Sequence, residues 1–269
     1  MAMPEKIKPI IEVKDLGTCF DDTWVHKNLN LTIYPHNITA IIGGSGSGKT
    51  TLIREILMLQ PVTEGEIYLL GQKISNLYYD EPKRRYFASK MGMMFQSGAL
   101  FSALTALDNV IFPLQEYTGF SREVMIDLAR LKLKMVGLDE KAFDRYPSEL
   151  SGGMLKRVAL ARTLALDPDI VFLDEPSAGL DPYSSKKLDE LILQLKADLN
   201  LSIIMITHEL ESIWRIVNDI VYIDQMKVLV HDSLEKVAKL TQYESLKNFF
   251  HGGQEHGQHS IAQGKKNEK

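Results

Sequence analysis

A run of glycine and serine that ends in lysine and threonine has the composition of a phosphate-binding loop. It reads Gly43-Gly44-Ser45-Gly46-Ser47-Gly48-Lys49-Thr50 and is followed by Thr51. Glycines allow several backbone N–H groups to converge on phosphate oxygens, and a helix that begins there adds its dipole. Lys49 can reach the terminal phosphates, and the Thr50 hydroxyl is suited to ligate Mg²⁺. Residues 43–51 therefore predict a nucleotide-phosphate site.

Two acidic residues at the end of an apolar run match the chemistry that such a loop needs. Residues 170–173 are apolar, and Asp174 and Glu175 follow them directly. In an open α/β sheet, ligands collect at the carboxyl ends of the strands. We therefore expect Asp174 to hold Mg²⁺ through water and Glu175 to polarise the attacking water. A solvated strand end is the alternative, but the phosphate loop independently requires a magnesium partner.

The segments around these residues alternate between strand-like and helical patterns. Residues 38–42 form an apolar run that enters the glycine-rich loop, and the amphipathic helix after the loop is expected to stop at Pro61. Residues 202–206 form another apolar run. Between the apolar runs at residues 170–173 and 202–206, Asp181-Pro182 has the residues of a helix N-cap and first turn. This β-α-β order predicts an α/β fold with a mainly parallel sheet.

Three other regions have different patterns. Residues 10–33 and 66–70 read as antiparallel strands, the latter bounded by Gly65 and Gly71, and residues 121–137 read as part of a helical insertion. From residue 252 onward the chain contains no aromatic residue. We expect one domain at residues 10–250, with a helical subdomain inserted at about residues 97–162, and a disordered tail at residues 251–269.

Composition limits the classes of protein and partner. The 269 residues are 45% hydrophobic and 25% charged, which is typical of a globular protein, and the net charge of −4 gives no general reason to bind nucleic acid. The single cysteine, Cys19, allows no internal disulfide. Neither a signal peptide nor an apolar run near the roughly 20 residues of a membrane span is evident. We expect a cytoplasmic chain.

One more segment is diagnostic of a family. It reads Leu150-Ser151-Gly152-Gly153-Met154 and precedes a basic, amphipathic helix. It resembles the signature motif of the ATP-binding cassette (ABC) ATPases, whose fold combines a RecA-like core sheet, an N-terminal antiparallel β subdomain and an inserted helical subdomain. In that family this helix N-terminus contacts the γ-phosphate held by the partner subunit. Taken alone, Ser-Gly-Gly is also an ordinary helix cap.

Further segments resemble the remaining ABC motifs in the same order. Gln96 matches the Q-loop glutamine, which approaches Mg²⁺ and the water, and His208 matches the switch histidine, which senses the γ-phosphate. Asp181 matches the D-loop aspartate at the dimer interface, although helix capping explains it equally. Phe20 lies where family members stack an aromatic ring on adenine. Trp24 competes for that role, and a single phenylalanine is usually a core residue.

A departure from the family pattern narrows the resemblance. Met154 stands where most cassettes have glutamine, so a hydrogen bond to ribose or to the partner nucleotide is expected to be lost. With the segments at residues 95–101 and 108–110, it makes the chain similar to the Mla/Mce-type lipid-trafficking ATPases. The motifs are also compatible with a cassette for a different solute, a cassette acting on ribosomes or DNA, and a signalling cassette. The mildly acidic charge and single cassette weigh against ribosomes and DNA.

The resemblance implies partners as well as a reaction. Two copies would clamp two MgATP molecules head to tail and drive an integral-membrane permease dimer from the cytoplasmic face of the inner membrane. An MCE-domain lipid-binding protein and a STAS-domain regulator are further implied partners. The permease would contact residues 97–113, with Ala99, Leu100, Phe101 and Leu104 as candidates, unless these residues pack the helical insertion itself. A metal site at the tail histidines His251, His256 and His259 has little support, because their spacing is that of a disordered segment and no pattern of acidic or cysteine co-ligands accompanies them.

Overall fold

A six-stranded sheet lies at the centre of the chain, whose computed structural model describes residues 7–251. The strand order is β10-β9-β3-β8-β7-β6, and the neighbouring strands are parallel except β9 and β10. The bounds are β3 Ile38–Ile42, β6 Met91–Met94, β7 Ile170–Asp174, β8 Ser202–Ile206, β9 Asp219–Asp224 and β10 Lys227–Ser233. The α/β fold with a mainly parallel core sheet is therefore confirmed.

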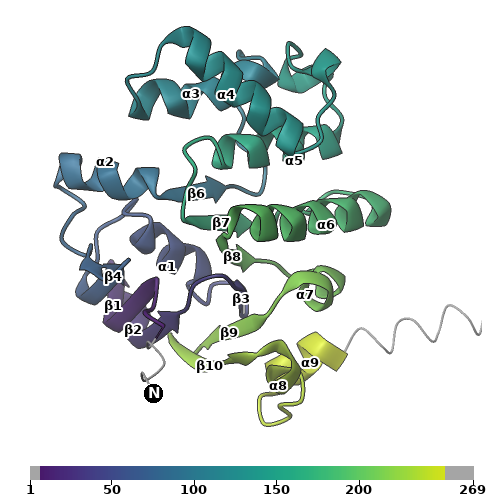
Figure 1. The fold of residues 1–269 in the computed structure, drawn as a ribbon. Coiled ribbons are helices and arrows are strands. Elements are labelled where there is room, and N and C mark those ends of the chain that lie inside the picture. Colours follow the sequence, from purple (N-terminus) through teal and green to yellow (C-terminus); the bar gives the residue numbers. More distant parts are fainter. Residues whose placement is uncertain (1–6, 252–269) are drawn as a thin grey trace, which may run out of the picture.

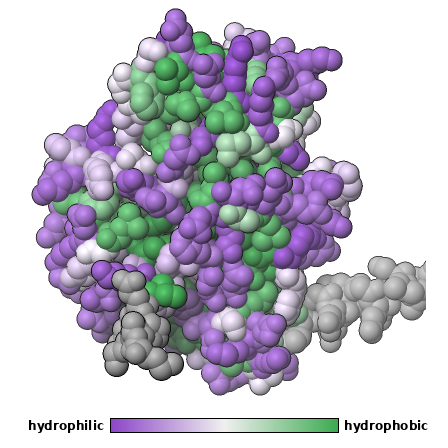
Figure 2. Space-filling model, viewed as in Figure 1, coloured by the Kyte–Doolittle hydropathy of each residue, from purple (hydrophilic) through white to green (hydrophobic). Residues whose placement is uncertain are grey.

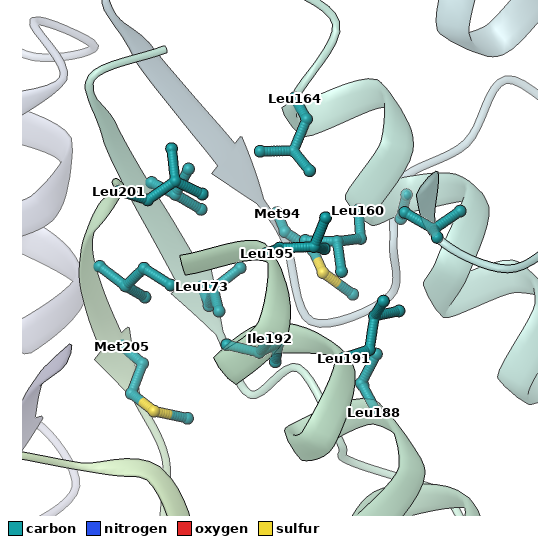
Figure 3. Packing of buried hydrophobic residues seen from close by; sticks show 14 of the residues in the cluster. Met94, Leu160, Leu164, Leu173, Leu188, Leu191, Ile192, Leu195, Leu201 and Met205 are labelled. Atoms are coloured by element: carbon teal, nitrogen blue, oxygen red, sulfur yellow. The ribbon is translucent and has the colours of Figure 1, made fainter. Parts of the chain in front are cut away.

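The central sheet separates two apolar cores. Val171 and Leu173 of β7 belong to one core, whereas Ile170 and Phe172 belong to the other. On the first side, leucines of α5 (Gly152–Thr163) and α6 (Pro182–Leu199) pack against strand residues such as Leu173 (Figure 3). Because both faces of the sheet are covered, its central strands are mostly apolar rather than alternating.

An antiparallel sheet and the helix α1 (Lys49–Ile56) enclose the second core (Figure 1). The strand order of this sheet is β2-β1-β4-β5. The bounds are β1 Ile11–Phe20, β2 Thr23–Ile33, β4 Glu64–Leu69 and β5 Gln72–Lys73. Leu16 of β1 and Leu52 of α1 share the core. The predicted antiparallel strands are thus present, and they lie against the helix that follows the glycine-rich loop.

Two predicted boundaries were wrong. β4 begins at Glu64, because Gly65 lies inside the strand with φ +86°, at a bulge where a Cβ would come within 2.5 Å of the Asp15 carbonyl oxygen. Helix α1 ends at Ile56, before Pro61. Met58 has φ +54°, and the Leu59 N–H donates to the Arg54 carbonyl, so a left-handed turn ends the helix.

The helical part of the chain lies at the end of the molecule opposite the N-terminus (Figure 1). Its main helices are α3 Ala106–Tyr117, α4 Arg122–Met135 and α5, with short 3₁₀ turns at residues 140–142 and 147–149. α2 (Glu81–Ser89) precedes β6. Ser121 caps α4 by accepting from the Val124 N–H, in agreement with the helix predicted at residues 121–137. Figure 2 shows apolar residues among polar ones on this part of the surface. The limits of about 97 and 162 for a subdomain stay a prediction.

Three helices complete the described chain. They are α7 Leu210–Ile216, α8 Leu234–Val237 and α9 Glu244–His251. His251 therefore ends a helix rather than beginning a disordered tail, and the rest of that predicted tail, with His256 and His259, lies outside the described residues. No helix within residues 7–251 combines the length and the apolar character that crossing a membrane requires.

Candidate functional site

The glycine-rich loop connects β3 to α1 at the carboxyl edge of the central sheet. Gly46 and Gly48 have φ +77° and +94°, and Gly48 is the N-cap of α1 without any side-chain cap. The first-turn N–H groups of α1 are thus not used by a capping side chain, which fits an anion such as a phosphate. Thr50, in this first turn, is exposed, and Thr51 is half-buried.

Lys49 folds back into the loop. Its Nζ donates to the carbonyl oxygens of Gly43 and Gly44, both at 2.8 Å, and lies 3.4 Å from Ser47 Oγ. Burial lowers the pKa of Lys49, and the negative charges of Glu175 and Asp174 oppose that shift. The ammonium and the two acids therefore share one electrostatic site.

Asp174 and Glu175 lie together at the end of β7, as predicted. Burial raises the pKa of both carboxyls; Arg54, Lys156 and Lys49 oppose the shift at Asp174. Glu175 has a left-handed backbone, with φ +46°, and its N–H donates to the Ile206 carbonyl at 2.9 Å. This backbone hydrogen bond to β8 holds a conformation that is costly for a residue with a Cβ.

His208 contacts the second of these acids. His208 Nε2 lies 3.7 Å from Glu175 Oε1, and the His208 N–H donates to Glu175 Oε2 at 3.4 Å. The charge of His208 also opposes the rise in the pKa of Glu175. The His208 side chain is 56% exposed, so the ring is accessible to a ligand at this edge of the sheet.

Gln96 follows β6, and its side chain is exposed. The backbone around it is held by Lys156 of α5, which donates to the Gln96 carbonyl at 2.6 Å and to the Glu175 carbonyl at 3.3 Å. Burial lowers the pKa of Lys156, against the pull of Glu209, Glu175 and Asp174. Lys156 was not predicted from the sequence, although it lies three and four residues before the buried Ala159 and Leu160, on the same helix face.

The signature segment is not brought into the phosphate loop of the same chain. Ser151 caps α5 by accepting from the Met154 N–H at 3.3 Å, and within the described residues its hydrogen bonds stay in that helix. Gly152 begins α5, and a Cβ on Gly153 would meet nothing within 4 Å. The N-terminus of α5 is therefore open to a ligand from outside the chain.

Asp181 has a local role that accounts for its position. It is the N-cap of α6 and accepts from the N–H groups of Tyr183 and Ser184, both at 3.0 Å. The side-chain and backbone hydrogen bonds of Ser184 lower the pKa of Asp181. The capping role is thus confirmed, and the D-loop role stays a prediction.

Phe20 and Trp24 differ in exposure. Phe20 ends β1 with 48% of its surface exposed, so it is not a core residue. Trp24 is half-buried, and the Lys27 ammonium lies 5.8 Å from its ring centroid. Of the two rings, Phe20 is the more accessible to a ligand.

Comparisons with known proteins identify the family of the chain. The family model for ABC transporters matches residues 26–178. The chain is 41% identical over 231 residues to the intermembrane phospholipid transport system ATP-binding protein MlaF of Haemophilus influenzae, with 85% of each chain covered. It is 36% identical over 226 residues to the methionine import ATP-binding protein MetN of Clostridium tetani, covering 84% of this chain and 70% of that one.

Solved structures of cassettes are similar in fold. A dimeric ATP-binding cassette in a post-hydrolysis state, bound to ADP and phosphate, has a TM-score of 0.74 and 31% identity, covering 83% of this chain and 98% of that one. The similarity in sequence and the similarity in fold both extend over most of the chain. The chain therefore belongs to the ABC transporter family, as an ATP-binding and ATP-hydrolysing subunit of an ABC transporter.

Proposed function

We propose that this ATPase drives phospholipid transport between bacterial membranes as part of an Mla/Mce-type system. The observation that carries the proposal is the 41% identity to MlaF over 85% of both chains. Met154 in the signature motif and the segment at residues 95–101 support the same subgroup. A methionine importer is the competing function, because the identity to MetN is 36%.

In the proposed reaction, the loop of residues 43–51 binds the phosphates of ATP, with Lys49 on the terminal groups. Thr50 and Gln96 would ligate Mg²⁺, and Asp174 would hold it through water; the ion would neutralise charge on the phosphates. Glu175 polarises the attacking water, a role that its raised pKa favours, and His208 contacts the γ-phosphate. Phe20 stacks on adenine. The convergence of Lys49, Asp174, Glu175 and His208 at one sheet edge supports these roles.

We propose that two copies complete each site. Ser151, Gly152 and Gly153 of one chain would face Lys49 of the other, with Asp181 at the interface. Two observations support this homodimer: the open N-terminus of α5, and the similarity to a dimeric cassette. Each chain would contribute its phosphate loop to one site and its signature segment to the other. ATP binding would therefore hold the two chains together, and hydrolysis would let them separate.

A groove beside the Q-loop is the proposed permease surface. Its volume is about 350 Å³, and its lining includes Phe95, Phe101, Phe112 and Tyr117. Of the four contacts expected from the sequence, Ala99 and Phe101 line the groove, whereas Leu100 packs against the core and Leu104 does not line it. Arg162 donates to the carbonyl oxygens of Gly98 and Ala99 and so fixes this wall. An apolar helix of a membrane protein fits such a lining.

The remaining proposals follow from the Mla/Mce resemblance. The chain would lie at the cytoplasmic face of the inner membrane, held there by the permease dimer. An MCE-domain protein would carry the lipid beyond the membrane, and a STAS-domain protein would regulate the ATPase. No role in nucleic-acid binding is proposed.

Reconstitution tests the substrate. The chain would be purified with the membrane proteins that accompany it and placed in liposomes with fluorescent phospholipid. We expect MgATP-dependent lipid transfer to acceptor vesicles and copurifying phospholipid. Uptake of methionine in place of lipid transfer would contradict the proposal, and ATP hydrolysis with neither kind of transport would favour a signalling cassette.

A second test concerns Lys156. We expect Lys156→Met to lower kcat by about tenfold and to leave the affinity for MgATP nearly unchanged, because two backbone carbonyls near the reacting groups lose their donor. Lys156→Arg should keep most of the rate. The control is Lys236→Met, which alters an exposed lysine paired with Asp232. Steady-state ATPase assays with nucleotide titration separate the two effects, and a weaker affinity at unchanged kcat would contradict this positioning role.

A further inference from the structure

Three polar side chains meet in the apolar layer beneath the phosphate loop. They are Thr18 on β1, His26 on β2 and Glu55 on α1, and each is 2% exposed or less. The surrounding core is built from residues such as Leu16 and Leu52. The proposed reaction uses none of the three polar groups.

The hydrogen bonds of this triad run in one direction. Thr18 Oγ1 lies 2.9 and 3.1 Å from the two carboxylate oxygens of Glu55 and donates its single hydrogen there. His26 Nδ1 lies 2.9 Å from the same Oγ1, so Nδ1–H donates to Thr18. These hydrogen bonds connect the imidazole through Thr18 to Glu55, on the helix that begins at Lys49. They fix the orientation of the ring from that side.

The other edge of the imidazole faces the phosphate loop. A Cβ built on Gly48 would lie 2.2 Å from His26 Nε2, 2.9 Å from His26 Cδ2 and 2.8 Å from Val25 Cγ1. The ring therefore occupies the side of Gly48 where another residue would carry its side chain. Gly48 is the left-handed residue that caps α1 and precedes Lys49, so its place sets the start of the helix.

Stability alone does not explain this arrangement. His26 Nε2 is buried and has no hydrogen-bond partner within residues 7–251. A buried nitrogen without a partner costs free energy, and well-packed apolar residues often replace buried polar groups without loss of stability. An unpaired buried group of this kind calls for an explanation, and strain and a functional role are among those known.

We propose that His26 is a positioning residue for the phosphate loop, oriented by Thr18 and Glu55 so that its ring fixes the place of Gly48. Thr18 also lies two residues before Phe20 on β1. The triad therefore connects β1, which carries the ring proposed to stack on adenine, to α1, which follows the phosphate loop. The inference rests on the proposed role of residues 43–51 in binding phosphate.

Binding and melting measurements on four variants test this role. The probe is the non-hydrolysable analogue AMP-PNP with Mg²⁺, titrated by calorimetry, and Tm is recorded for each variant. We expect His26→Ala to weaken binding by about tenfold, and His26→Phe, which keeps a ring beside Gly48, to recover most of it. Leu133→Ala, at a fully buried position on α4, should lower Tm without weakening binding.

Each outcome has a distinct meaning. Parent-like binding by His26→Ala with a lowered Tm would overturn the inference, because His26 would then serve stability alone. Equal weakening by Leu133→Ala and His26→Ala would also overturn it. The fourth variant, Lys49→Ala, tests the proposed phosphate loop itself: if it binds as the parent does, that proposal fails, whatever the His26 variants do.

Discussion

Replacing Glu175 by glutamine is expected to lower ATP turnover by about 10²- to 10⁴-fold, the range for loss of a general base. Glutamine keeps the size of the side chain and leaves the backbone contacts to Lys156 and Ile206 in place. It cannot take a proton from water. Burial raises the pKa of Glu175, which makes its carboxylate a better proton acceptor than an exposed one. The ATP-bound dimer should therefore accumulate, as measured by size-exclusion chromatography with MgATP.

The matched control for this variant is Glu211→Gln. Glu211 lies on α7, three residues after His208 in the sequence, but is 82% exposed and pairs only with Arg215 within the described chain. Its replacement removes the same charge without changing the sheet edge, so parent-like turnover is expected. Full turnover by Glu175→Gln would reject Glu175 as the group that polarises water.

Two further inactive variants should restore each other's activity when mixed. Lys49→Ala removes the ammonium of the phosphate loop, and Gly153→Asp places a negative charge at the open start of α5, where a phosphate would approach. Each variant alone is expected to lose nearly all ATP turnover, because every site in its dimer is defective. The measurement is a steady-state ATPase assay on each variant and on their mixture.

Mixing the two variants in equal amounts tests whether sites are shared between chains. Half of the dimers then contain one chain of each kind, and one of their two sites combines an intact Lys49 with an intact signature segment. About a quarter of the parent rate is therefore expected if each site works on its own. If the site lay within one chain, no mixture could recover activity. The Thr50→Val variant mixed with Lys49→Ala is the negative control, because both changes fall in the same half-site.

The central sheet was predictable because its information is local. β3, β7 and β8 are buried on both faces, so each is a mostly apolar run in the sequence, and Asp174 and Glu175 end such a run. The glycine-rich loop likewise has a composition that few other structures require. These features depend on residues next to one another in the chain.

The supporting residues were not predictable in this way, because they act between distant segments. Lys156 binds carbonyl groups 60 and 19 residues away. The burial of His26 could not be predicted because of a bulge. Leu29, Leu31 and Ile33 are buried at every second position of β2, a pattern that would place the even-numbered His26 on the exposed face. The left-handed Asn28 shifts that alternation, and the register changes between Leu29 and His26. The shift exists only when β2 pairs with β1.

The self-contacts of Lys49 make nucleotide capture an exchange of oxygen partners. The ammonium already donates to two carbonyl oxygens of its own loop, so a phosphate gains only the difference between the new contacts and those it replaces. A single small anion makes few contacts, so it offsets little of the free energy of the lost hydrogen bonds. A chain of linked phosphates also reaches the N–H groups at the start of α1 and can offset that loss. The loop should thus discriminate by the number of linked phosphates, even in a cell where free phosphate is abundant.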